Sequence, residues 1–573
     1  MLSSGRVAPL LLVLVVFATL VAVIDPIRDM MTQDDGWAYA RSVKHLVQTG
    51  EYRLDAWAAA SMPVQIAFAA GLSRIFGYSL PLLRLTTLAL LLCGAIAFYG
   101  LLREFRTDAH VAAALTLVLI CCPLVLWLGF TFMTDVQFLG WVLIACFFYV
   151  RGLRRNSAGI LFVAGLFAAL AVGTRQFGAA LPAGLAFAWL TTPPSLRPIS
   201  FAVLAGGAVP TAAFIWQVWA ARVHPNFTQL VRLTEQTMYL HQSPVRLAAD
   251  VLWRCSVLAE YAGLLVAALL PALLLLECRG RPSSAEPSRE RWKHATALAV
   301  AAWIFFLLCG HVLSFQGSGG FSVPHLTAAL MPTIPWVLGE VTPESPVCRL
   351  VVTTIAIFSV TVAFLAFVRR SPVTTFWGQR TPATCFLAGT FFAFVAMHLI
   401  YVQLNDTYTI ILVPFVLIAI ALTVGNDLRP GRYAQVMAIT AASFGLITAL
   451  WMRGDYNKQE AIWRASEDIH STGVDTMQIR GSLHWVEYHS AFDRWLEQIG
   501  TEARPEDFSG SYRLHGPFYR WVTETQKTAQ YIIYASECVP DVGGYETVRR
   551  IPYRDMLMRR RFVYVIRRRG LSH

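Results

Sequence analysis

The sequence has little charge for its length. Only 14% of its 573 residues are charged, whereas in soluble globular proteins the fraction is about 25%. Hydrophobic residues make up 56% of the chain, and its mean hydropathy is +0.52. These values exclude an ordinary soluble protein and predict a polytopic α-helical membrane protein.

Metal-site cysteine spacing and internal repeats are also missing. None of the ten cysteines forms a C-x-x-C pair, and several lie in apolar runs, as Cys121 and Cys146 do. Neither a disulfide framework nor a zinc site is therefore expected. The only biased tract is the Pro/Ser/Arg-rich stretch 279–291, so a repeat array is not predicted either. No clear A-x-A site follows the apolar run 8–24, which we expect to be an uncleaved first span.

The basic residues are arranged as topology signals. A net charge of +12 would suggest nucleic acid binding in a soluble chain, but here the arginines lie in short loops between apolar runs, and such loops face the cytoplasm. With the N-terminus inside, and with the proline-containing segment 325–338 not crossing, the loops predict about thirteen spans. The predicted spans are 8–24, 80–102, 111–129, 136–150, 158–173, 177–191, 200–221, 258–277, 295–314, 350–368, 384–402, 408–424 and 433–451.

This topology divides the chain into two parts. Residues 1–452 form the transmembrane domain, whose first outer loop is 25–79, and residues 453–573 have the mixed charge of a small outer α/β domain. Its β-rich pieces are 530–535, 545–551 and 562–566. The outer face also receives the turn 131–137, Arg175, and the segments 222–257, 315–349 and 405–408.

Two adjacent carboxylates, Asp34 and Asp35, follow the first span and precede a helical pattern over 38–47 that Gly50 ends. Helix capping explains one acid at this place, since unpaired amides there favour negative charge. A third carboxylate, Asp135, follows Thr134 in another outer turn, where capping is again an alternative. If the two loops converge, one acid can remove a proton from a hydroxyl while another orients it or holds a divalent cation.

Arg175 lies on the outer side, where the topology rule does not explain a cation. Binding of a phosphate explains it, and snorkelling to lipid headgroups is the alternative. Lys44 can add to the same anion site, and His325, Asp406 and Tyr408 are further polar groups of the outer face. A metal has no signature of its own, so Mg²⁺ or Mn²⁺ at Asp34 and Asp135 is left open.

The motif Asp34-Asp-Gly-Trp-Ala-Tyr39, followed by Gly50-Glu-Tyr and Met62-Pro-Val with Phe76-Gly77, resembles the first outer loop of the GT-C membrane glycosyltransferases. The branches it is most similar to are the lipid A aminoarabinose transferases and the protein O-mannosyltransferases. Thr134-Asp135, Arg175-Gln176 and Asn405-Asp-Thr-Tyr408 resemble their later site motifs. The chain departs from the pattern in having Asp35 where Glu is frequent, one proline where two are common, and Thr407 where Arg is usual.

The resemblance implies an inverting hexosyl- or pentosyltransferase of the inner membrane. Such an enzyme moves a sugar from a polyprenyl-phosphate carrier to a lipid, glycan or protein acceptor on the periplasmic face. It implies that Asp34 is the catalytic acid position, that Asp35 and Asp135 assist it, and that Tyr39, Arg175, Asp406 and Tyr408 bind substrate. Lys44 and His325 are added as candidate substrate-binding residues because of their place on the outer face. The sugar and the acceptor depend on pocket shape and do not follow from the sequence.

Two other functions remain as alternatives. A transporter or flippase of lipid-linked sugars should carry ionisable residues near mid-bilayer and a pseudo-repeat, and the spans here are nearly uncharged in the middle without such a repeat. An O-antigen polymerase or ligase would use a lipid diphosphate in place of the monophosphate carrier.

The predicted topology is testable with fusion reporters. A reporter inserted within Ser283 to Ser288 should behave as cytoplasmic, and one fused after Gly454 as periplasmic, because the basic loops fix the parity of the spans. A cytoplasmic signal after Gly454 would mean that segment 325–338 crosses the membrane and that the second half of the predicted layout is wrong.

Overall fold

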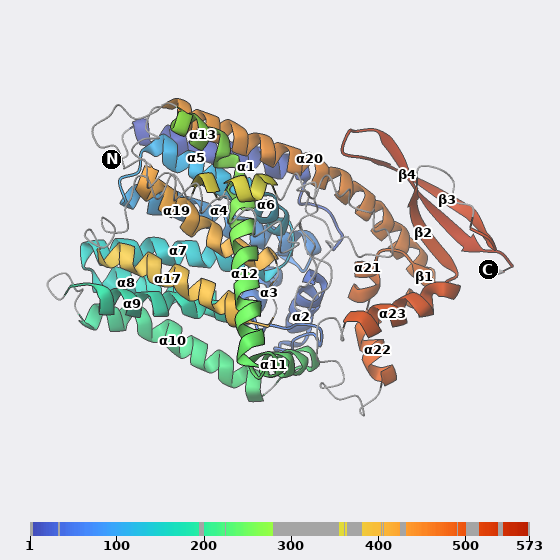
Figure 1. The fold of residues 1–573 in the computed structure, drawn as a ribbon. Helices are drawn as coiled ribbons and strands as arrows, with labels where there is room; N and C mark the ends of the chain where they lie inside the picture. Colours follow the sequence, from blue (N-terminus) through green and yellow to red (C-terminus); the bar gives the residue numbers. More distant parts are fainter. Residues whose placement is uncertain are drawn as a thin grey trace.

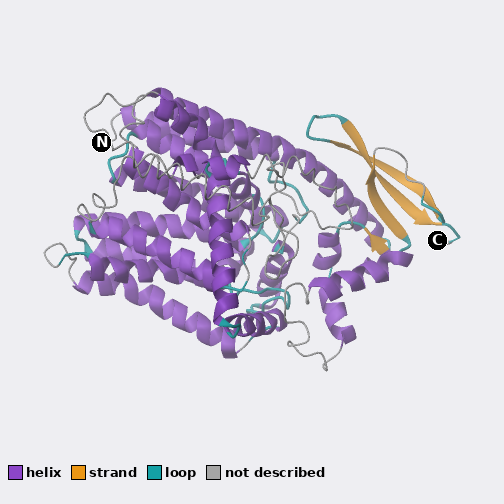
Figure 2. Cartoon of the chain, viewed as in Figure 1, coloured by secondary structure: helices purple, strands orange, loops and turns teal. Residues whose placement is uncertain are grey.

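The structure is a computed structural model dominated by long helices, with strands gathered at the C-terminal end of the chain (Figure 2). Most of the helices form one bundle, from which the longest helix runs to a smaller C-terminal part (Figure 1). The residues that the structure describes are 4–31, 35–193, 200–223, 225–278, 354–359, 361–363, 381–402, 404, 406–424, 431–489, 491–499, 515–536 and 542–570.

The bundle is built mainly from apolar helices. Large hydrophobic side chains such as Phe162, Trp216 and Ile439 remain exposed on it, which suits helices that face lipid. Its helices are α1 (Ser4–Ile24), α4 (Leu80–Glu104), α5 (Ala109–Ile120), α6 (Pro123–Gly129), α7 (Thr134–Arg155), α8 (Ala158–Thr174), α9 (Ala180–Thr191), α10 (Ser200–Val223), α12 (Pro244–Leu265), α13 (Leu270–Cys278), α17 (Pro382–Ile400), α19 (Val413–Val424) and the first part of α20 (Gly431–His470).

Within the described residues, four helices are long and apolar enough to cross a membrane, and up to six crossings result if each bent pair counts as one. Two predicted spans are interrupted. The span at 111–129 bends by 66° between α5 and α6, where Pro123 starts a new helix. The span at 258–277 already begins as a helix at Pro244 and bends by 48° near Val266. The predicted span 295–314 and most of 350–368 lie outside the described residues.

The first outer loop contains two short helices, α2 (Gly36–Thr49) and α3 (Pro63–Phe76). The predicted helix over 38–47 is confirmed as α2, and it ends where predicted. Gly50 has a φ of +78° and donates its N–H to the Leu46 carbonyl, a left-handed ending that glycine adopts without strain. The helix α3 starts at Pro63, whose missing N–H is not needed in a first turn.

The C-terminal part has a small sheet, as predicted. Its strand order is β1-β2-β4-β3, with β1 and β2 parallel and the other pairs antiparallel. The elements are β1 (Ile479–Arg480), β2 (Tyr531–Ser536), β3 (Tyr545–Arg554), β4 (Arg560–Arg568), α21 (Leu483–Tyr488), α22 (Ala491–Ile499) and α23 (His515–Thr525). The helix α20 continues without a break through the domain boundary predicted at 452/453.

Two glycines bring α4 and α7 close together. A Cβ at Gly140 would lie 2.7 Å from the Leu90 carbonyl oxygen, and one at Gly94 would lie 2.9 Å from the Gly140 Cα. Small residues of this kind let helix backbones approach closely in membranes. The packing matters for the site because Asp135 is in the first turn of α7.

Replacing Gly140 by Val should destabilise the protein by about 1–3 kcal/mol, because the backbone of α4 leaves no room for the side chain. Thermal unfolding in detergent measures the effect. Gly71→Val is the matched control, since a Cβ there meets nothing within 4 Å. Equal melting temperatures for the two variants would contradict the close packing of α4 on α7.

Candidate functional site

The carboxylate of Asp35 is held by an indole. Asp35 precedes α2 in the N-cap position, but its side chain accepts no capping hydrogen bond. Instead, the Trp57 Nε1–H donates to Asp35 Oδ1 at 2.9 Å. Capping therefore does not explain Asp35, whose carboxylate is held by a residue later in the same loop.

Asp135 and Arg175 form a buried ion pair. Arg175 Nη1 donates to Asp135 Oδ1 at 2.5 Å, and the exposed side-chain fractions are 11% and 0%. Asp135 is not the cap of α7 either, since Met133 occupies that position. Burial is the largest influence and opposes the charge of Arg175, but Asp135, Tyr408 and Tyr39 together outweigh it and hold the pKa of the guanidinium above its ordinary value. Arg175 is thus a permanent cation inside the protein, and snorkelling to lipid does not describe its position.

Two tyrosines complete this cluster. The Arg175 guanidinium lies over the Tyr408 ring, 4.3 Å from its centroid, at a distance typical of cation–π contacts. Tyr39 of α2 is buried within electrostatic reach of Asp35, Asp135, Arg175 and Tyr408. Burial and then the Asp35 charge raise the pKa of the Tyr39 hydroxyl well above its ordinary value. Tyr39 is therefore a neutral hydrogen-bond donor that interacts with both Asp35 and Asp135, which is the arrangement that the functional interpretation of these acids requires.

One carboxylate oxygen of the cluster stays available. Asp135 Oδ2 is buried, and no hydrogen-bond partner for it is found among the described residues. A buried acceptor without a partner is unfavourable unless a ligand or water supplies a donor. Asp135 Oδ2 is therefore an acceptor whose donor is not among the described residues.

Arg84 of α4, which the sequence analysis did not single out, holds the backbone ahead of the acidic pair. Its buried guanidinium donates to the carbonyl oxygens of Pro26, Arg28 and Met30, at 2.5 to 3.2 Å, and to that of Phe130 at 2.9 Å. It therefore ties the first outer loop to the segment that leads into Asp135.

Arg254 of α12 likewise holds backbone, in the segment that precedes Tyr408. It is buried and donates to the carbonyl oxygens of His398, Tyr401 and Val402, which lie shortly before Tyr408. No signal in the sequence distinguishes these two arginines from topology signals, because their partners are carbonyl groups that every residue has.

The helix α11 (Phe227–Leu240) joins the first outer loop to the segment that precedes Tyr408. Asn226, its N-cap, donates to the carbonyl oxygens of Asp55 and Ala58. At the other end, Gln236 exchanges hydrogen bonds with Ile400 and Val402. This helix lies in the segment 222–257 that the sequence analysis assigned to the outer face.

The C-terminal part contacts the acidic loop through aromatic rings. Trp57, which holds Asp35, has ring centroid distances of 4.8 Å to Phe492 of α22 and 5.5 Å to Phe518 of α23. Its ring also lies 5.9 Å from Trp37 of α2. Aromatic pairs at these distances contribute beyond their buried area, so the C-terminal helices help to fix the position of Asp35.

The remaining predicted residues are not part of this cluster as described. Asp34 and His325 lie outside the described residues, and nothing is described of the Asp406 side chain. Lys44 lies elsewhere, with its Nζ 5.7 Å from the Tyr488 ring centroid. No group of three or more metal-binding side chains occurs in the described part of the chain, and a cation shared by Asp34 and Asp135 stays a prediction.

Comparisons with known proteins add similarities of overall layout. No protein-family profile and no curated protein matches the chain. It is similar to ArnT from Cupriavidus metallidurans bound to undecaprenyl phosphate, at 16% identity, a TM-score of 0.42 and full coverage of both chains. It is also similar to the archaeal oligosaccharyltransferase AglB from Archaeoglobus fulgidus in complex with an inhibitory peptide and a dolichol-phosphate, at 11% identity and a TM-score of 0.43, over 92% of this chain and 69% of that one.

Both proteins belong to the GT-C group that the motif around Asp34 and Asp35 resembles. At identities and TM-scores of this size, the function of the chain has to be argued from its own residues.

The ion pair gives a testable stability pattern. Arg175→Met should destabilise the protein by about 3–5 kcal/mol, because it leaves the buried Asp135 carboxylate without its partner. The double variant Arg175→Met/Asp135→Leu should recover most of that loss, since neither charge remains to be buried alone. Thermal unfolding of the single and double variants measures the coupling. Losses that simply add would show that the two side chains do not form a buried pair.

Proposed function

We propose that the chain is a membrane glycosyltransferase that moves a sugar from a polyprenyl-phosphate carrier to an acceptor hydroxyl on the periplasmic face of the inner membrane. The observation that carries the proposal is the buried cluster of Arg175, Asp135, Tyr39 and Tyr408 beside Asp35. A fixed cation next to several carboxylates is what a transfer between a phosphate and a hydroxyl needs.

The proposed reaction inverts the configuration at the anomeric carbon of the sugar. The acceptor oxygen forms a bond to the anomeric carbon while the bond from that carbon to the phosphate oxygen breaks, and the polyprenyl phosphate leaves with the electron pair. Asp34 takes the proton of the acceptor hydroxyl, because a hydroxyl is a weak nucleophile until a carboxylate removes that proton. Asp35 adjoins this base, and its hydrogen bond from Trp57 keeps it in place.

The leaving phosphate carries negative charge, and Arg175 supplies the matching cation. Its Nη1 is engaged by Asp135, whereas a guanidinium has five N–H donors in total. Its other donors can therefore bind phosphate oxygens, and the neutral Tyr39 hydroxyl can add a hydrogen bond. The free oxygen of Asp135 orients the acceptor hydroxyl, or holds a Mg²⁺ or Mn²⁺ ion if one is required.

The proposal includes the topology predicted above, with about thirteen spans and an outer C-terminal domain. The site then lies at the outer membrane boundary, where a lipid-linked donor places its phosphate. Arg84 and Arg254 support this placement because they hold irregular backbone close to the apolar helices, and such backbone is tolerated at membrane depth only when its polar groups are satisfied.

The decisive variant is Asp34→Asn, which keeps the size of the side chain and a capping oxygen but cannot accept a proton. Turnover with a polyprenyl-phosphate sugar should fall by about 10²- to 10⁴-fold, the range typical of lost general base catalysis. The turnover of Asp35→Asn and of Asp135→Asn should fall less. If Asp35 and Asp135 hold a cation, added Mn²⁺ should partly restore the turnover of these two variants.

The control is Asp29→Asn, which removes an exposed carboxylate of the same loop. It should leave turnover unchanged. The assays use purified variants with matched melting temperatures, so that lost folding is not read as lost chemistry. Turnover near the wild-type level in Asp34→Asn would end the proposal for that residue.

A further inference from the structure

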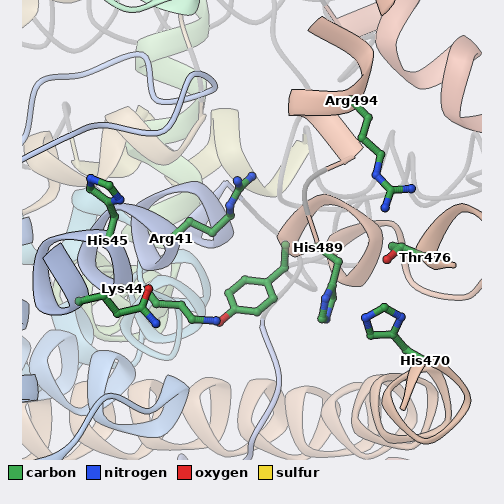
Figure 3. Close-up of a pocket in the computed structure, with 9 residues that line it drawn as sticks. Arg41, Lys44, His45, His470, Thr476, His489 and Arg494 are labelled. Carbon is green, nitrogen blue, oxygen red and sulfur yellow. The ribbon is translucent and has the colours of Figure 1, made fainter. Parts of the chain in front are cut away.

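A cleft separate from the buried cluster opens between α2 and the C-terminal part. It has a volume of about 420 Å³, within the range of small-molecule sites. Figure 3 shows Arg41, Lys44 and His45 on one side and His470, His489 and Arg494 on the other. The remaining lining residues are Gln48, Thr476 and Tyr488.

The cleft and the buried cluster use opposite faces of α2. At about 100° per residue, Arg41, Lys44, His45 and Gln48 lie on average about half a turn away from Tyr39. Tyr39 is oriented toward Arg175 and Asp135, whereas the other four residues line the cleft. A ligand in the cleft is therefore bound separately from the proposed reaction centre, although the same helix supports both.

The lining of the cleft carries cations and histidines but no carboxylate. The acids that balance these cations are in the surrounding structure. Asp55 and Asp493 contact Arg41, and Asp475 holds Arg494 at 2.8 Å. Glu467 contacts His489 at 2.9 Å. Among the described residues no carboxylate lies within 4 Å of the Lys44 Nζ, and His45 Nε2 is buried without a hydrogen-bond partner.

We infer that this cleft binds the phosphate monoester of a phosphorylated sugar. Lysine and arginine provide the charge-assisted hydrogen bonds that phosphate oxygens accept most strongly. Gln48, Thr476 and Tyr488 add neutral donors and acceptors that suit sugar hydroxyls. The three histidines of the cleft form no metal-binding group in the described structure, so an anion fits the lining better than a metal ion does.

Such a phosphate has two sources, a soluble sugar phosphate or the headgroup of a membrane lipid. Both present the same monoester beside hydroxyl groups, and the cleft adjoins the loop that follows the first span. Binding of a phosphate monoester in the cleft goes beyond the proposed transfer reaction, because it does not require the polyprenyl-phosphate sugar.

The test measures binding to the full-length protein in an uncharged detergent. Calorimetric titration with glucose phosphate is compared with titration with glucose, and a second arm uses phosphatidylcholine vesicles with and without phosphatidylinositol phosphate. Saturable binding of a phosphorylated probe is expected, with no binding of glucose and with weaker affinity at high salt.

The variants Lys44→Gln and Arg494→Gln should each weaken that binding by about tenfold, because each removes a charge-assisted contact. Lys527→Gln and Arg549→Gln are the matched controls. They remove exposed, carboxylate-paired cations of the C-terminal part that do not line the cleft, and their affinity should stay within about twofold of the wild type.

Binding of glucose phosphate alone identifies a soluble ligand, and binding of the phosphorylated vesicles alone identifies a lipid headgroup. Either outcome supports the inference. It is overturned if neither probe binds saturably, or if the control variants weaken binding as much as Lys44→Gln and Arg494→Gln. Because no transfer is measured, this failure is distinct from inactivity of Asp34→Asn.

Discussion

The ion pair between Asp135 and Arg175 is the contact on which one end of the helix bundle depends. A charge buried alone is strongly unfavourable, so each partner forces the other to stay in place. Asp135 starts α7, Arg175 follows α8, and the ring of Tyr408 covers the guanidinium from a third part of the chain. Segments more than two hundred residues apart are therefore fixed around one cation, and the acidic loop packs onto the result through Tyr39.

Around this pair, irregular backbone is held by side chains. Arg84 and Arg254 each donate to several carbonyl oxygens, one before the acidic pair and one before Tyr408. Arginine suits this task because its five donors are held in a rigid plane and keep their charge. The helix α11 joins the first outer loop to the segment before Tyr408, through Asn226 and Gln236. The side chains of the cluster are thus carried by loops and by the ends of helices, and hydrogen bonds from buried arginines hold the adjoining backbone in place.

Patterns within one segment were readable from the sequence. Gly50 predicted the end of α2, β-rich pieces predicted β2, β3 and β4, and the basic loops placed the acids and Arg175 on one face, a condition for the contact that the structure shows. Contacts between distant segments were not readable. Trp57 is one of many aromatic residues until Asp35 and Phe492 surround it, and the contact of Lys44 with Tyr488 joins segments more than four hundred residues apart. The sequence also could not show that α12 begins at Pro244, since the polar first turns of that helix lack an apolar pattern.

The forty residues of α20 have a mechanical consequence. A continuous helix of this length extends for about 60 Å, from the bundle to the C-terminal sheet (Figure 1). Bending it would break backbone hydrogen bonds in its middle, so the C-terminal part cannot swing on it as on a flexible linker. At Gly454 the helix also passes so close to Met556 that a Cβ would lie 2.4 Å from its backbone nitrogen. The rigid helix and this close contact therefore hold the C-terminal part in one position, with Phe492 and Phe518 against Trp57 of the acidic loop.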